Sequence, residues 1–173
     1  MTAPALDIQY VPGAVPTADA DLAYLATEVV WVARMRARQT ASFGVPYNYS
    51  GQRYAAAEMP PVIAAIAERA AVLAEHGFNN CLCNRYDTGA RTMGFHSDSY
   101  DGLVPSSRIA IASFGAPRAI VFRSADKLHT SELVLEHGSI LLMNRATQDA
   151  WRHAIPRDRA AGLRISATFR LIA

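Results

Sequence analysis

The segment 94–98 (GFHSD) places an imidazole, His96, and a carboxylate, Asp98, two residues apart. On a strand or at its end, side chains two apart point to the same side, so both could reach one metal ion. His153 could supply a third ligand. Two histidines and one carboxylate leave three octahedral positions open, which suits non-haem Fe(II) that binds a cosubstrate and dioxygen. His-x-Asp alone is a weak signal, so this metal hypothesis needs support from elsewhere in the chain.

The C-terminal segment 164–170 (RISATFR) alternates polar and apolar residues and predicts a strand with two different faces. Arg164, Ser166, Thr168 and Arg170 share one face. If the apolar face packs on helices, the polar face points into a barrel, where two guanidinium groups without partners would be very costly. An anionic ligand would remove that cost. The alternative is the solvent-facing side of an edge strand, and spacing alone favours that alternative.

A second polar pair alternates in the same way, because Asn84 and Tyr86 lie opposite Cys81 and Cys83 on a predicted strand. Asn84 and Tyr86 would then face the barrel interior. An amide and a phenol can each donate to a carboxylate oxygen, which complements two arginines around a dicarboxylate. The two cysteines form no disulfide framework and no zinc-ribbon spacing, so we expect them to be reduced core residues.

In chain order, the motifs Asn-x-Tyr, His-x-Asp, His and Arg-x5-Arg resemble those of the AlkB family of Fe(II)- and 2-oxoglutarate-dependent dioxygenases. The resemblance extends from about Arg38 to the C-terminus. Four blocks stand in family order: CNRYDTGARTMGFHSDS, SFGAPRAIVFR, LEHGSILLMNRATQDAWRHAIP and RISATFR. The resemblance implies a double-stranded β-helix core with His96, Asp98 and His153 as the catalytic iron ligands.

The same resemblance implies where the cosubstrate binds. Asn84 and Arg170 would hold the keto-acid end of 2-oxoglutarate, and Tyr86 and Arg164 its distal carboxylate. Ser166 stands where the family commonly has asparagine; a serine can still accept and donate, so cosubstrate binding should survive. The implied reaction uses O2 as second cosubstrate and releases succinate, CO2 and an aldehyde from an N-alkyl group.

The segment 46–51 (PYNYSG) is similar to the nucleotide-recognition lid of the DNA-repair members, where an aromatic ring stacks an extruded base against the first iron-binding histidine. By position, Tyr49 would be the stacking ring and Tyr47 a polar contact to the base. The alternative is that these aromatics close the barrel mouth by packing alone.

The substrate side departs from the family pattern. Repair members usually have an acidic residue one or two places after the iron-binding aspartate, but Ser99 and Tyr100 occupy those substrate-binding positions here, and the next acid is Asp101. Loss of that charge weakens the case for a cationic base. A basic pair that often follows the VFR block is also missing. We expect oxidative dealkylation of an N-alkylated base in single-stranded or flipped DNA or RNA. The alternative substrate is a small nucleoside-like or secondary metabolite.

Helices are expected ahead of the strands that carry these motifs. Thr17 precedes an acidic first turn, and apolar residues recur until Val32 with a basic end near Arg38, which predicts one helix over this stretch. The aromatic, Gly- and Pro-containing segment 40–53 predicts a short hairpin or flap. Pro60 and Pro61 open a second helix, and Gly77 ends it.

From Phe78 onward, six or more short strands follow one another between turn-rich pieces. This order predicts an α+β fold, mainly β, with a double-stranded β-helix (jelly roll) core and two N-terminal helices packed on one side. We expect one domain over residues 1–173. Residues 1–77 would supply helical support and the substrate lid, and residues 78–173 the core.

The overall composition is that of an ordinary globular domain: 173 residues, 51% hydrophobic and 18% charged. No apolar run is long enough for a membrane span, and the N-terminal sequence lacks signal-peptide features, so we expect a cytoplasmic protein with no membrane contact. The net charge of +2 is too small to indicate the dense basic face of a strong duplex binder.

Overall fold

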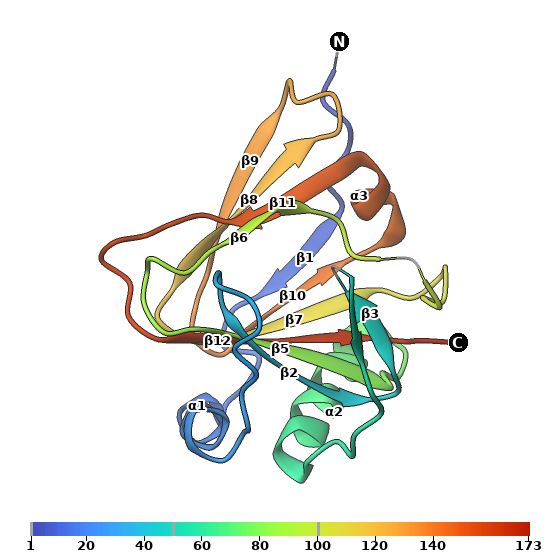
Figure 1. Ribbon diagram of the computed structural model, residues 1–173. Coiled ribbons are helices and arrows are strands. Elements are labelled where there is room, and N and C mark those ends of the chain that lie inside the picture. Colours follow the sequence, from blue (N-terminus) through green and yellow to red (C-terminus); the bar gives the residue numbers. More distant parts are fainter. Residues whose placement is uncertain (1, 50, 100) are drawn as a thin grey trace.

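Two antiparallel sheets form the body of the computed structural model, which describes residues 2–49, 51–99 and 101–173, apart from the side chain of Tyr49. The larger sheet has the order β1-β10-β7-β12-β5-β2, and the smaller sheet β6-β11-β8-β9 (Figure 1). This arrangement confirms the predicted jelly-roll core, mainly β. The strands of the larger sheet are β1 (Ile8–Val11), β10 (Ser139–Met143), β7 (Ile109–Gly115), β12 (Arg164–Arg170), β5 (Asn80–Tyr86) and β2 (Gln39–Gly44). Those of the smaller sheet are β6 (Met93–His96), β11 (Trp151–Ile155), β8 (Arg118–Ser124) and β9 (Thr130–Leu135).

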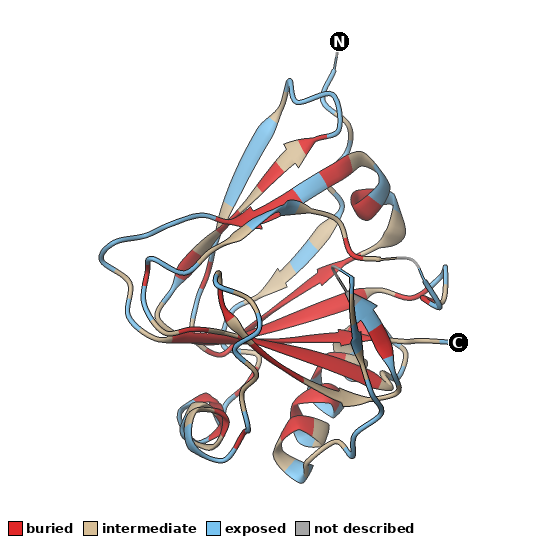
Figure 2. Cartoon of the chain, viewed as in Figure 1, coloured by how far each residue is buried: buried red, intermediate tan, exposed pale blue. Residues whose placement is uncertain are grey.

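Strand β12 lies in the middle of the larger sheet, between β7 and β5, and all its residues are buried (Figure 2). Its apolar residues Ile165, Ala167 and Phe169 pack in the hydrophobic core shared with the helices. Its polar residues face the other way and line a cavity between the sheets. The predicted interior position of Arg164 and Arg170 is therefore confirmed, and the edge-strand alternative is wrong.

Helices α1 (Ala18–Thr27) and α2 (Pro61–Ala74) cover the outer face of the larger sheet, as predicted (Figure 1). Helix α2 begins at the proline pair. It ends at Glu75, which adopts the left-handed conformation with φ 64°, two residues before the expected stop at Gly77. The buried small and branched residues of both helices fill the space over β5, β7 and β12.

The expected extension of the first helix to Arg38 is wrong. Helix α1 ends at Thr27, and residues 29–32 (VVWV) follow in non-helical backbone, with Val32 bridged to Thr40. Three of these four residues are valines, and β-branched and aromatic residues lose side-chain rotamer freedom in a helix, which disfavours its continuation there. Arg38 consequently lies just before β2, where its side chain is buried and donates to Asn84.

The predicted hairpin over residues 40–53 is only partly confirmed. Strands β3 (Tyr47–Tyr49) and β4 (Gln52–Tyr54) do form a two-stranded hairpin, which we call the lid. Residues 39–44 instead form β2, which pairs with β5 at the edge of the larger sheet. Strands β1, β2 and β11 and the short helix α3 (Arg145–Ala150) were not among the predicted elements.

Strands β1 and β2 come from the first 77 residues, so this part of the chain supplies strands to the larger sheet as well as helices and lid. The division of the domain at residue 77 stays a prediction. No helix of the described chain combines the length and the apolar character that crossing a bilayer requires.

Candidate metal and cosubstrate site

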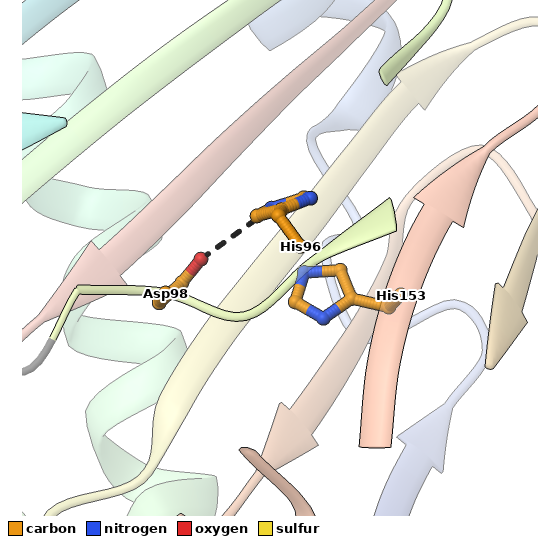
Figure 3. Close-up of side chains that lie close together, drawn as sticks. All are labelled: His96, Asp98 and His153. Atoms are coloured by element: carbon orange, nitrogen blue, oxygen red, sulfur yellow. Dashed lines mark ion pairs between the residues drawn. The ribbon is translucent and has the colours of Figure 1, made fainter. Parts of the chain in front are cut away.

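The three predicted metal ligands meet between the two sheets. His96 ends β6, Asp98 follows two residues later, and His153 lies on β11 directly opposite His96 in the strand pairing. One nitrogen or oxygen of each side chain lies within 4.8 Å of the others. His96 Nε2 is 3.7 Å from Asp98 Oδ1, and the two imidazole centroids are 4.3 Å apart. Figure 3 shows the three side chains pointing toward one another.

Burial sets the protonation of these groups. It lowers the pKa of His153 to about 4, with help from the neighbouring His96, and it also lowers the pKa of His96. Burial would raise the pKa of Asp98, but Arg170 and the two histidines outweigh it, and the pKa of Asp98 is lowered. At neutral pH the site therefore holds two neutral imidazoles and one carboxylate, which are the forms that bind a metal ion.

Neighbouring groups orient the ligands. His96 Nδ1 donates to the Gly94 carbonyl oxygen at 2.8 Å, which leaves the lone pair on Nε2, the nitrogen that faces Asp98. Gln148 of α3 accepts a hydrogen bond from the backbone N–H of Asp98 at 3.0 Å. Two imidazole nitrogens and one carboxylate oxygen with fixed orientations match the donor set of non-haem Fe(II). The residues present therefore fit the metal that the sequence predicts.

One cavity contains both the triad and the residues predicted to hold 2-oxoglutarate. Its lining combines the polar face of β12 with side chains of β5, β6 and β11. Every predicted metal and cosubstrate residue contributes to it, namely Asn84, Tyr86, His96, Asp98, His153, Arg164, Ser166 and Arg170.

The end of the cavity around Arg164 and Tyr86 is rich in unused donors. Arg164 is 1% exposed, and its Nη2 donates to Ser113 Oγ at 3.1 Å. Its Nε and Nη1, and the hydroxyl of Tyr86 beside it, make no hydrogen bond of ordinary geometry within the described residues. A buried donor without an acceptor costs about 1–3 kcal/mol. A carboxylate bound here would satisfy all three, so this end fits the distal carboxylate of 2-oxoglutarate.

The end of the cavity near the triad is already linked by hydrogen bonds. Arg170 donates from Nε and Nη2 to Asp98, and its guanidinium carbon lies 4.4 Å from the centre of the Tyr47 ring. Asn84 Oδ1 accepts from Arg38 Nε at 2.7 Å. The roles of Asn84 and Arg170 toward the keto acid stay predictions. Sequence reasoning did not assign Arg38 or Gln148 to the site; the only signal was that the resemblance starts near Arg38 and that Gln148 lies in one of the family-like blocks.

Of the predicted substrate residues, Tyr47 and Ser99 are described. Tyr47 is buried on Arg170, and Ser99 is half-buried. Tyr100 and the side chain of Tyr49 lie outside the described residues. Asn48 of the lid donates to Asp101 at 3.2 Å, so the lid touches the loop that follows Asp98.

Comparison with known proteins agrees with this geometry. Residues 16–170 match the family model described as the 2OG-Fe(II) oxygenase superfamily. The chain belongs to that superfamily. In an alignment of 138 positions that covers 75% of this chain and 58% of the relative, it is 36% identical to "DNA oxidative demethylase ALKBH2" of Mus musculus. In an alignment of 186 positions that covers 93% of this chain and 64% of the relative, it is 32% identical to "Alpha-ketoglutarate-dependent dioxygenase alkB homolog 3" of Mus musculus.

These relatives confirm the predicted AlkB family within the 2OG-Fe(II) oxygenase superfamily, and with it Fe(II), 2-oxoglutarate and O2 as the cofactor and cosubstrates of the family. The chain spans less than two thirds of the length of both relatives. The solved structure titled "The structure of OsALKBH1" has a TM-score of 0.71 and 15% identity, and covers 98% of this chain and 99% of that one. At this identity the match supports the fold alone.

Proposed function

We propose that this chain is an Fe(II)- and 2-oxoglutarate-dependent dioxygenase that removes alkyl groups from N-alkylated bases in single-stranded or flipped DNA or RNA. One observation carries the proposal: the His96–Asp98–His153 triad and the unused donors of Arg164 and Tyr86 line the same buried cavity. The names of the two mouse relatives, a DNA oxidative demethylase and an α-ketoglutarate-dependent dioxygenase, support the same activity.

Each part of the cavity has a separate task in this proposal. The triad would hold Fe(II), which activates dioxygen for oxidation of the substrate carbon attached to nitrogen. Arg164 and Tyr86 bind the distal carboxylate of 2-oxoglutarate and so fix the cosubstrate relative to the triad. For an N-methyl group, the substrate, O2 and 2-oxoglutarate are converted to the free amine, formaldehyde, succinate and CO2.

The lid supplies the substrate side. It touches the loop after Asp98 through the Asn48–Asp101 hydrogen bond, and its Tyr47 ring contacts Arg170, the partner of Asp98. We assign Tyr49 as the ring that stacks an extruded base, by its position in the lid sequence. Base stacking on an aromatic ring contributes about 1–3 kcal/mol and tolerates any base, which suits a single-stranded substrate.

A turnover experiment tests this proposal. Protein reconstituted anaerobically with Fe(II) and 2-oxoglutarate is exposed to O2 with an N-methylated single-stranded oligonucleotide, and oligonucleotide mass, formaldehyde and succinate are measured. We expect loss of the methyl group with equal amounts of formaldehyde and succinate. The His153→Ala variant should form neither product, whereas His129→Ala, outside the cavity, should behave as the wild type.

A small-molecule substrate is the second candidate. The residues that follow Asp98 favour it, because they supply no acid for a cationic base: Ser99 is uncharged, and the next acid, Asp101, is exposed and bonded to the lid. In that case free alkylated nucleosides would be turned over and oligonucleotides would not. Succinate formation without any oligonucleotide demethylation would contradict the nucleic-acid proposal, and binding that does not weaken with salt would do the same.

A further inference from the structure

Arg118, at the start of β8, is a buried guanidinium that neither the metal triad nor the predicted cosubstrate residues account for. Its side chain is 1% exposed. Nη2 donates to two backbone carbonyl oxygens, of Arg91 at 2.8 Å and of Pro156 at 2.6 Å. Nε and Nη1 have no hydrogen-bond partner among the residues that the structure describes. Buried donors of this kind are rare in folded proteins and call for an explanation.

A second buried guanidinium lies on the same tyrosine. The Arg118 guanidinium carbon is 5.6 Å from the centre of the Tyr86 ring, and that of Arg164 is 5.2 Å from it. Neither arginine forms an ion pair within the described parts of the chain, and Asp158, whose charge favours protonated Arg118, is exposed. Burial lowers the pKa of both groups, yet a guanidinium stays protonated at neutral pH. Two positive charges are therefore buried around Tyr86 without a carboxylate.

The backbone contacts of Arg118 connect this end of the cavity to the metal triad. Arg91 lies two residues before β6, the strand that ends at His96, and Pro156 directly follows β11, the strand that carries His153. One side chain thus joins the two strands that bring the imidazoles together and also contacts Tyr86 of the cosubstrate end. It does not line the cavity itself, so any effect on a ligand must pass through Tyr86 or through its charge.

We propose that Arg118 is a positioning and specificity residue for the distal carboxylate of 2-oxoglutarate, which acts behind Tyr86 and makes the cavity select dianionic over monoanionic 2-oxo acids. This inference rests on the proposed function. Arg164 with Ser113 would hold the carboxylate directly, and the Arg118 charge would raise the electrostatic cost of leaving that end without an anion. The contact with the ring also holds the Tyr86 side chain in place beside Arg164.

Binding without turnover tests the role. Dissociation constants of 2-oxoglutarate and of 2-oxovalerate, which has a methyl group in place of the distal carboxylate, are measured by calorimetry with Mn(II) replacing Fe(II). The readout is the dissociation constant of 2-oxovalerate divided by that of 2-oxoglutarate, which measures the preference for the dianion. A general loosening of the fold weakens both ligands and leaves the ratio unchanged, whereas loss of the Arg118 charge weakens only the dianion. We expect Arg118→Gln to lower the ratio at least tenfold.

Two further variants keep the outcome decisive. Arg118→Lys retains the charge and should keep the ratio within about threefold of the wild type. Arg85→Gln is the matched control, because Arg85 also stacks on an aromatic ring, Trp31, and donates to a carbonyl, but on the opposite face of the larger sheet; its ratio should not change. An unchanged ratio in Arg118→Gln overturns the inference. If Arg118→Gln does not fold and Arg118→Lys does, a tenfold fall of the ratio in Arg118→Lys overturns it as well. Failure of the proposed function is distinct, because the wild type would then show no preference for 2-oxoglutarate.

Discussion

Arg170 donates two hydrogen bonds to a single oxygen of Asp98, with Nη2 at 2.9 Å and Nε at 3.2 Å from Oδ2. Both side chains are buried, with 2% and 3% of their surfaces exposed. The other carboxylate oxygen, Oδ1, is the one that faces His96. The pair therefore keeps Asp98 ionised against the effect of burial and directs one oxygen toward the proposed metal position.

Removal of this arginine should cost more stability than removal of a surface ion pair. Arg170→Gln leaves a buried carboxylate without its cation, and breaking a buried pair costs about 3–5 kcal/mol. We expect that loss in the free energy of unfolding by urea in the presence of EDTA, and partial recovery on addition of Mn(II), which again places a cation at Asp98. The control is Arg145→Gln, because Arg145 pairs with Asp149 at the surface at 3.9 Å. An exposed pair contributes about 0–1 kcal/mol. Equal losses in the two variants would contradict the role of Arg170.

The triad predicts stabilisation by metal alone. A ligand at about 100 times its dissociation constant raises the free energy of unfolding by about 2.7 kcal/mol. For a chain of this size that corresponds to a rise in Tm of about 5–10 °C. We expect this rise with Mn(II), its reversal by EDTA, and its absence in His153→Ala. A shift retained in His153→Ala, or lost equally in His129→Ala, would place the metal elsewhere.

Substitution of Gln148 should weaken metal binding less than the loss of a ligand such as His153 does. Its Oε1 is the acceptor for the backbone N–H of Asp98, and both residues are buried. Gln148→Met keeps the length of the side chain and removes the acceptor, so the loop that carries Asp98 loses its anchor. Removal of a hydrogen bond that orients a metal ligand typically lowers metal affinity by about 10–100-fold. Titration with Mn(II) should show that loss, whereas Gln9→Met, on the surface strand β1, should bind Mn(II) as the wild type does.

Local rules predict only part of the site, namely that His96 and Asp98 share a side and that β12 has a polar and an apolar face. The choice of His153 as third ligand, and of an interior position for the polar face, comes from the resemblance to the AlkB family and not from spacing. Side chains two apart on a strand share a face, so the spacing of His96 and Asp98 and the alternation of 164–170 carry over directly into the structure. The proline pair likewise marked the start of α2. The end of α1 was mispredicted because apolar spacing and terminal charges continued past Thr27, while the β-branched run 29–32 decided the backbone.

The supporting residues could not be predicted in this way. Arg38 reaches Asn84 across 46 positions of sequence, Gln148 reaches Asp98 across 50, and Arg118 reaches Pro156 across 38. Such contacts depend on how the two sheets pack together, and no local pattern marks them. The same holds for Tyr47, whose lid position suggested a contact with a base while the packed lid puts its ring on Arg170.

The position of Tyr47 leads to a prediction that separates two roles for the lid. Tyr47 is 2% exposed, and the centre of its ring lies 4.4 Å from the guanidinium carbon of Arg170, so the ring helps to hold that arginine in place. A cation–π contact of this kind contributes about 0.5–2 kcal/mol, which corresponds to about 2- to 30-fold in affinity. Tyr47→Leu should therefore weaken 2-oxoglutarate binding to the Mn(II)-loaded protein even when no nucleic acid is present. The control is Tyr54→Leu. Tyr54 lies in the partner strand of the lid and its hydroxyl forms a hydrogen bond with Thr40, so its loss should leave the affinity for 2-oxoglutarate unchanged. If Tyr47→Leu instead binds 2-oxoglutarate normally and loses only oligonucleotide affinity, the ring serves the substrate and not the cosubstrate.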